Sequence, residues 1–198
     1  MNDAERLERE NQRLAEEIKR LVKAERQLYE VQEHLDEQMR IYRRLYEVGQ
    51  KFNATFDVAT VVDLTTHFVI YDLNFERCLL FLRAPDQPGF RVAGLDGYYD
   101  VDVAARVASL SLPKDTVLAT ARGSGAERVM YADHDSDAQL RELSAALGMD
   151  EYAACLLGGE ANDALGLLVA GNTAANAQYH ARIEAESESL LGLAHLVS

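Results

Sequence analysis

A leucine recurs at every seventh position near the start of the chain, at Leu7, Leu14, Leu21, Leu28 and Leu35. A strict seven-residue repeat places these side chains on one face of a helix and is typical of a coiled coil. Leucine at heptad position d favours two parallel strands, so the spacing predicts a parallel coiled-coil dimer over residues 1–48. A single helix that packs on the chain's own globular part is the alternative.

The a and d positions form the seam of this predicted dimer, whose members are Leu7, Asn11, Leu14, Ile18, Leu21, Leu28, Leu35 and Met39. Asn11 can pair with its own copy across the dimer axis, which sets the register at some cost in stability. Glu25 and Gln32 also fall at a positions, where a carboxylate facing its copy must lose its water or take up a proton. The middle of the seam is therefore weak, either as a tolerated defect or because a change of register there serves signalling.

The apolar stripe becomes wider after Leu35, at Ile41, Leu45, Val48 and Phe52. A wider stripe indicates packing on more than one neighbour. No glycine or proline occurs before Gly49, so we expect the coiled-coil helix to continue as the first helix of a globular domain at residues 41–198. Gly49 is the expected flexible point of that helix.

Beyond residue 53 the hydrophobic period changes several times. Asp57 is well placed to cap a helix over residues 58–73, and short apolar runs predict strands at 75–84, 90–99, 152–157 and 165–170. A less regular middle region predicts helices at 101–110, 115–121 and 136–147 with a strand at 128–132, and a terminal helix is expected from residue 177. This order predicts an α+β fold with a central antiparallel sheet flanked by helices.

The net charge of −13 results from 20 Lys and Arg against 33 Asp and Glu, and most of the excess lies after residue 51. An acidic domain opposes binding to nucleic acid and to anionic membranes. The apolar runs are far shorter than the ~20 residues of a membrane-spanning helix. Two cysteines without a secretory signal indicate a reducing compartment. We therefore expect a cytoplasmic protein with no nucleic-acid partner and no membrane insertion.

The sequence contains no phosphate-binding loop, HExxH pair or nucleophile elbow, so we predict no catalytic residues. Asp133, His134, Asp135 and Asp137 are the densest group of candidate metal ligands. They directly precede a predicted helix, where aspartates interact favourably with the helix N-terminus, and this structural role is the alternative. We predict neither a metal site nor a cofactor.

Residues 41–198 resemble a GAF domain, the sensor module of many bacterial signalling proteins. The resemblance rests on the order of elements and on the stretches LYEVGQKFNATFDVATVVD, RCLLFLRA and LGLLVAGN. It implies a small-molecule cavity between the sheet and the irregular middle region, with polar groups from Tyr98, Tyr99, Arg128, Tyr131, His134 and Tyr152. Tyrosines also close a core with the hydroxyl in water, which is the alternative role. The resemblance does not identify the ligand. Neither Cys78 nor Cys155 has a histidine beside it, so we do not expect a bilin.

These observations predict a non-catalytic, dimeric sensor or relay region of a signal-transduction protein. Its expected effector is a histidine kinase, as in a two-component system, or a diguanylate cyclase. Ile183, Leu190 and Val197 repeat at seven, and no capping glycine or proline follows, so we expect the helix to continue into a further domain. A helix that frays at a true C-terminus is the alternative. The competing function is a structural dimerisation scaffold without a small-molecule ligand.

Overall fold

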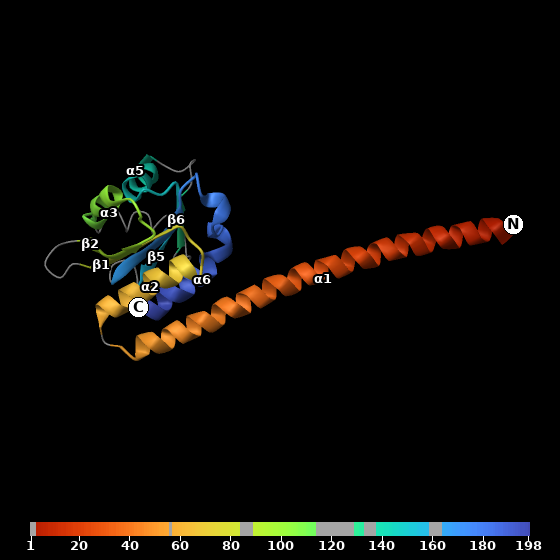
Figure 1. Cartoon of the computed structure of the whole chain (residues 1–198), viewed down its shortest axis with the longest axis horizontal. Helices are drawn as coiled ribbons and strands as arrows, with labels where there is room; N and C mark the ends of the chain where they lie inside the picture. Colours follow the sequence, from red (N-terminus) through yellow and green to blue (C-terminus); the bar gives the residue numbers. More distant parts are fainter. Residues whose placement is uncertain (1–2, 56, 84–88, 114–128, 133–137, 159–163) are drawn as a thin grey trace. The chain divides into compact units, whose positions relative to one another are not determined.

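The computed structural model describes residues 3–55, 57–83, 89–113, 129–132, 138–158 and 164–198 (Figure 1). The chain separates into two units, Met1–Arg43 and Arg44–Ser198, and each is considered by itself. None of the helices in these described ranges combines the length and the apolar character that crossing a membrane requires.

Helix α1 spans Asp3–Asn53 without interruption, and its residues from Arg44 onward belong to the globular unit. Within that unit, Leu45, Val48 and Phe52 are buried. Gly49 lies inside the helix, and a Cβ placed on it would be 3.2 Å from Leu196 Cδ2. This glycine therefore has a packing role, because it leaves room for a leucine side chain from the C-terminal helix.

The globular unit is built on a six-stranded sheet whose order is β3-β2-β1-β6-β5-β4. Its strands are β1 (Arg77–Arg83), β2 (Phe90–Asp96), β3 (Ser111–Leu112), β4 (Val129–Ala132), β5 (Glu151–Leu157) and β6 (Gly166–Asn172). All neighbouring strands are antiparallel. The α+β prediction with a central antiparallel sheet is confirmed, and the two-residue strand β3 was not predicted.

Helices cover both faces of this sheet (Figure 1). Helices α2 (Val58–Tyr71) and α6 (Ile183–Val197) contact β1, β2 and β5 on one face. Helix α3 (Val101–Ala108) contacts β2, and α5 (Ala138–Leu147) contacts β4, on the other face. The expected helix at 115–121 and the turn at 86–89 lie wholly or mainly outside the described residues.

Helix α2 begins where the sequence predicts. The Asp57 carboxylate accepts hydrogen bonds from the backbone N–H groups of Ala59 and Thr60. The side-chain and backbone hydrogen bonds from Thr60 lower the pKa of Asp57. Val58, the first residue of the helix, is 62% exposed.

The terminal helix begins later than the sequence predicts. Ala177–Tyr179 forms a 3-10 turn, η1, and the α-helix starts only at Ile183. Long-range hydrogen bonds hold the intervening segment against the sheet: the Ala181 N–H donates to the Asn74 carbonyl at 2.9 Å, and Asn172 Nδ2 donates to the Ala181 carbonyl at 3.0 Å. These bonds override the helical preference of the local sequence.

The Glu76 carboxylate fastens the same β6–α6 connection. Its Oε2 accepts from Thr173 N at 2.6 Å and from Thr173 Oγ1 at 2.7 Å, and its Oε1 accepts from Asn176 Nδ2 at 2.9 Å. Burial raises the pKa of Glu76, but the hydrogen bonds from Thr173 and Asn176 outweigh it and the pKa is lowered overall. The ionised form is the one that the folded chain stabilises.

We predict that Glu76→Gln lowers the free energy of unfolding at pH 7 by about 1–3 kcal/mol, because an amide nitrogen then faces hydrogen-bond donors. A lowered folded-state pKa means that the carboxylate's contribution exists above its unfolded pKa and is lost as the pH falls through the folded-state value. Urea unfolding of wild type and variant should therefore converge in acid. Glu188→Gln, an exposed control, should change little. A difference that persists unchanged into acid contradicts this assignment.

The fit of α2 on the sheet gives a second prediction. A Cβ on Gly94 would lie 2.2 Å from Val62 Cγ1, so Gly94→Ala must displace α2 and should cost about 1–3 kcal/mol. Val62→Ala removes the colliding methyl. In a double-mutant cycle by urea unfolding, the double variant should be clearly more stable than the sum of the single effects allows. Strict additivity would show that the two residues do not meet.

Candidate functional site

The face of the sheet covered by α3 and α5 holds one continuous apolar cluster. Alternate residues of the strands supply it, because successive side chains of a strand point to opposite faces. Its strand members are Leu79 and Phe81 of β1, Phe90 of β2, Leu112 of β3, Tyr152, Ala154 and Leu156 of β5, and Leu167 and Val169 of β6. Val107, Leu147 and Met149 from the covering elements also belong to it. We call this face the cluster face.

Tyr152 is the polar exception inside this cluster. It is only 1% exposed, and its hydroxyl has no hydrogen-bond partner among the residues that the structure describes. Burial raises the pKa of Tyr152 to about 12, so the phenol is neutral at physiological pH. A buried hydroxyl without a partner costs about 1–3 kcal/mol, so a group that could hydrogen-bond to it would be favoured there.

A second polar group lies where Tyr98 packs against the same cluster. The Tyr98 hydroxyl donates to the Leu147 carbonyl at 2.7 Å, and burial raises its pKa. The Arg77 guanidinium stacks over the Tyr98 ring at 5.1 Å and donates to the Gly148 carbonyl. Gly148 has a φ of +67°, which places its carbonyl in this turn at the end of α5. Tyr98 is thus already hydrogen-bonded, whereas no described residue bonds the Tyr152 hydroxyl.

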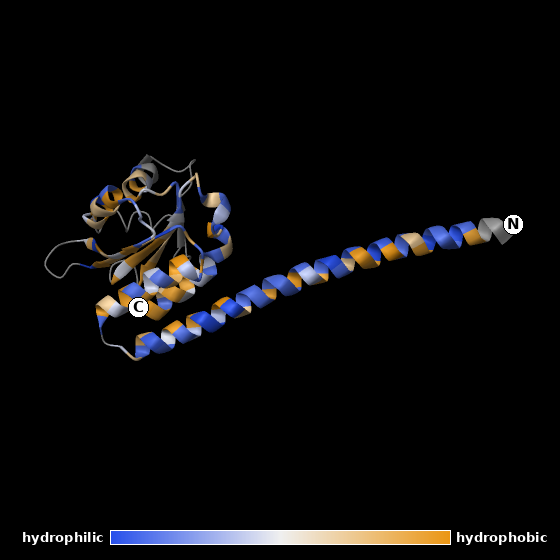
Figure 2. Cartoon of the chain, in the orientation of Figure 1, coloured by the Kyte–Doolittle hydropathy of each residue, from blue (hydrophilic) through white to orange (hydrophobic). Residues whose placement is uncertain are grey.

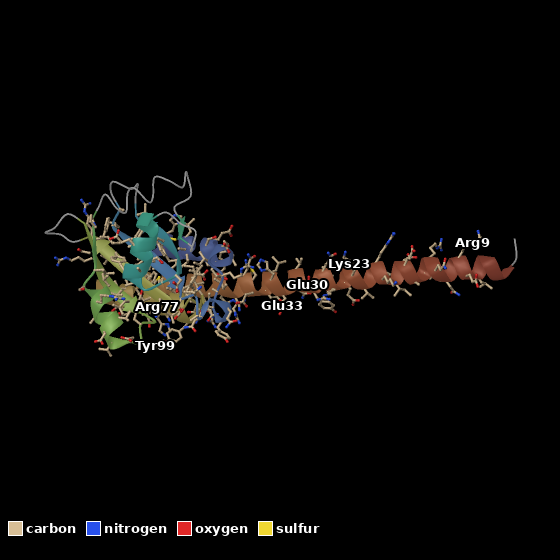
Figure 3. All side chains as sticks on the ribbon, turned by 90° about the horizontal axis from the view of Figure 1, so that it is seen from above. Arg9, Lys23, Glu30, Glu33, Arg77 and Tyr99 are labelled. Atoms are coloured by element: carbon tan, nitrogen blue, oxygen red, sulfur yellow. The ribbon has the colours of Figure 1, made fainter. Side chains whose placement is uncertain are left out.

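Arg77, which was not among the predicted ligand residues, stands at the start of β1 and is labelled in Figure 3. Arg77 alternates with Leu79 and Phe81, so its side chain belongs to the cluster face. A charged residue directly before an apolar strand was the signal available. This signal is weak, because a charged residue next to an apolar strand usually lies in solvent at the end of the strand.

The remaining predicted ligand residues are not all brought together. Tyr99 is 84% exposed and lies at the margin of the unit (Figure 3). Tyr131 belongs to β4, where its backbone pairs with Ala153 of β5. Arg128 and His134 lie outside the described residues, as do Asp133, Asp135 and Asp137. The structure therefore places Tyr98 and Tyr152 together on the cluster face and Tyr99 apart from it.

The opposite face contains both cysteines. Cys78 and Cys155 are free thiols, and both are buried. Burial raises the pKa of Cys155 to about 12, and burial with the charge of Asp96 raises the pKa of Cys78 well above its ordinary value. Over the part of the chain that is described, His, Cys, Asp and Glu form no group of three that could hold a metal ion.

In the first unit, the described seam residues are exposed in the single chain. Leu14 is 45% exposed and Leu28 is 67% exposed, and Leu7, Ile18, Leu21, Leu35 and Met39 lie between these values. Figure 2 shows apolar residues recurring along an otherwise hydrophilic α1. Arg26 and Glu30 form one of the intrahelical ion pairs at 3.0 Å. Charged side chains on the polar faces thus pair within the helix, whereas the apolar seam residues are exposed in the single chain.

No family model matches the chain, and no curated protein matches it in sequence. Solved structures match it in fold. A methyl-accepting chemotaxis protein fragment, residues 122 to 287, has a TM-score of 0.58 and 16% identity over 76% of this chain and 92% of its own. The GAF domain of a phosphoenolpyruvate-protein phosphotransferase from Coxiella burnetii has a TM-score of 0.58 and 20% identity over 80% and 91%.

A third similar structure is the free methionine-R-sulfoxide reductase from Neisseria meningitidis, with a TM-score of 0.57 and 13% identity over 77% of this chain and 83% of its own. At such low identities the likenesses concern architecture alone. Together with the sheet order and the helices on both faces, they show that the globular unit of this chain has the GAF fold.

Proposed function

We propose that this chain is a non-catalytic, dimeric sensor or signal-relay region of a cytoplasmic signal-transduction protein. The observation that supports this most is the continuity of α1, because one helix contains the seam and then packs through Leu45 and Phe52 into a GAF-fold unit. The fold shared with a chemotaxis-protein fragment supports the same class of function. In this proposal a parallel homodimer forms through the seam.

Signal transfer would use the helices on the face opposite the cluster. A ligand-induced change in the sheet would move α6 and the end of α1, and the packing of the dimer seam would change with them. The polar layers at Glu25 and Gln32 lower the stability of the seam, so alternative packings there cost less. The receiver in this proposal is a histidine kinase of a two-component system or a diguanylate cyclase.

The absence of catalysis is part of the proposal, and the state of the thiols supports it. Reduction of a sulfoxide, the chemistry named for one of the similar structures, requires a source of two electrons, and thiolates are the usual protein source. Cys78 and Cys155 are buried with raised pKa values, so neither offers a thiolate at neutral pH. A packing role in the core fits these two thiols better than a redox role.

A structural scaffold without a small-molecule ligand is the competing function. The Tyr152 hydroxyl, for which the described part of the chain offers no hydrogen-bond partner, favours a sensor, because a ligand on the cluster face could supply that bond. The cluster is otherwise densely apolar, as a scaffold requires. Ligand-induced stabilisation distinguishes the two functions.

We predict that Tyr152→Phe leaves the ligand-free protein as stable as wild type or up to about 1–3 kcal/mol more stable, because it removes a buried hydroxyl without a partner. Tyr98→Phe is the matched control and should lose about 0.5–1.5 kcal/mol, since its hydroxyl is hydrogen-bonded. Thermal unfolding measures both. Clear destabilisation by Tyr152→Phe would mean that its hydroxyl is already satisfied.

The same assay tests for a ligand, with cyclic nucleotides, haem and divalent metal ions as probes. A compound present at about 100 times its Kd stabilises the folded state by about 2.7 kcal/mol. A sensor should be stabilised by at least one probe, and Tyr152→Phe should reduce that stabilisation if the hydroxyl is used. No stabilisation by any probe would favour the scaffold.

The dimer is tested by disulfide formation across the seam. Leu21→Cys lies at position d and should give a rapid interchain disulfide under mild oxidation if the strands are parallel and in register. Lys23→Cys, at the outward position f of the same turn, is the matched control and should react far more slowly. The buried native thiols keep the background low. A monomeric mass in solution without crosslinking at Leu21→Cys would refute the dimer.

A further inference from the structure

Two consecutive residues at the start of β1 hold two different connections of the globular unit. Glu76 accepts hydrogen bonds from Thr173 and Asn176 and so fastens the β6–α6 connection. Arg77 donates to the Gly148 carbonyl and so fastens the turn between α5 and β5. The first connection leads into the C-terminal helix, and the second belongs to the cover of the cluster face. One pair of neighbouring residues therefore contacts elements from both sides of the sheet.

The guanidinium of Arg77 is not fully hydrogen-bonded in this arrangement. One of its terminal nitrogens donates to Gly148, and the group stacks over the Tyr98 ring at 5.1 Å. Its Nε is buried, and no described residue accepts a hydrogen bond from it. Glu76 Oε1 lies 3.9 Å from this nitrogen, which is beyond hydrogen-bond distance. Because a buried donor without a partner is unfavourable, a closer approach to Glu76 would stabilise the Arg77 side chain.

The Glu76 carboxylate lies between two sets of donors. Thr173 and Asn176 bond to it at 2.6 to 2.9 Å and keep it on the β6–α6 connection. Arg77 is a charged donor, and a charged donor forms a stronger hydrogen bond with a carboxylate than a neutral one does. The Arg77 side chain is 20% exposed and that of Glu76 is 10% exposed, so water screens their attraction only in part. Arg77 therefore competes with Thr173 and Asn176 for this carboxylate.

The α5–β5 turn determines where Arg77 can lie. The Tyr98 hydroxyl donates to the Leu147 carbonyl at 2.7 Å and keeps the ring under the guanidinium. Gly148 leaves room for the same group, because a Cβ on Gly148 would be 2.9 Å from Arg77 Nη1. The guanidinium can occupy this place only while the turn stays in its present position.

We propose that Arg77 is a switch residue that exchanges partners between the Gly148 carbonyl and the Glu76 carboxylate. In the arrangement described above, Arg77 holds the turn and leaves Glu76 to hold the β6–α6 connection. When the turn moves away, Arg77 closes on Glu76 and weakens the hydrogen bonds from Thr173. A change in the cover of the cluster face thus loosens the segment that precedes α6. This inference rests on the proposed sensor function and adds the residues that link the two sides of the sheet.

Hydrogen exchange of the Thr173 amide in the ligand-free full chain tests the switch. Gly148→Ala places a methyl group against Arg77 Nη1 and should accelerate this exchange at least about tenfold relative to Val169, a central residue of β6. Gly158→Ala is the matched control, because Gly158 has a φ of +69° against +67° for Gly148 but follows the opposite end of β5. The control should change the ratio by less than about twofold. An unchanged ratio in folded Gly148→Ala would overturn the proposal.

Arg77→Met separates the switch from a simple clamp. A clamp predicts that loss of Arg77 loosens the β6–α6 connection, so that Thr173 exchanges faster. The switch predicts a wild-type or slower rate, because no charged donor then competes for Glu76. It also predicts that Gly148→Ala has no further effect on Thr173 once Arg77→Met is present. Faster exchange of Thr173 in Arg77→Met would overturn the partner exchange.

Tyr98→Phe is a second way to release the turn, and it adds no atoms that could prevent folding. It removes the bond to the Leu147 carbonyl and should accelerate Thr173 exchange in the same direction as Gly148→Ala. An unchanged rate in Tyr98→Phe and in folded Gly148→Ala would exclude the switch and leave the sensor function standing. Failure of every probe to stabilise the protein would instead exclude the sensor and leave the exchange results unaffected.

Discussion

The rest of the globular unit depends on the burial of both faces of the three central strands. All seven residues of β6 are buried, as are most residues of β1 and β5. A sheet that is apolar on both sides must be covered on both sides. The helices α2 and α6 form one covering layer, and α3 and α5 belong to the other.

The centre of the sheet also explains the composition of LGLLVAGN. A Cβ on Gly166 would lie 2.2 Å from the Phe81 carbonyl oxygen, and a Cβ on Gly171 would lie 2.2 Å from that of Glu151. Both glycines of this strand permit a close approach of neighbouring backbones. The stretch is thus specified by packing at each end of β6 and does not indicate ligand chemistry.

Features with a strong local signal were predictable from the sequence, and features set by long-range bonds were not. The uninterrupted helix α1, the Asp57 cap and the four main strands follow from periodicity and capping rules. The start of α6 does not, because the hydrogen bonds of Ala181 with the Asn172 side chain and the Asn74 carbonyl hold the preceding residues on the sheet. For the same reason the candidate site was predicted only in part. Tyr98 and Tyr152 lie on one face, but the stacking of Arg77 on Tyr98 depends on a turn 71 residues away.

The contact between α1 and α6 restricts which movements the two helices can make. Leu45 lies against Gly192 and Leu196 lies against Gly49, so large and small residues alternate along two helices that run in the same direction. Within each helix the leucine and the glycine are four residues apart, which is about one helical turn. A piston-like slide of one turn would bring Leu45 against Leu196 in one direction and Gly49 against Gly192 in the other, which gives either a collision or a void. Sliding by one turn is therefore unfavourable both ways, by collision in one direction and by lost packing in the other, and rotation or tilting of the two helices as a pair avoids both costs.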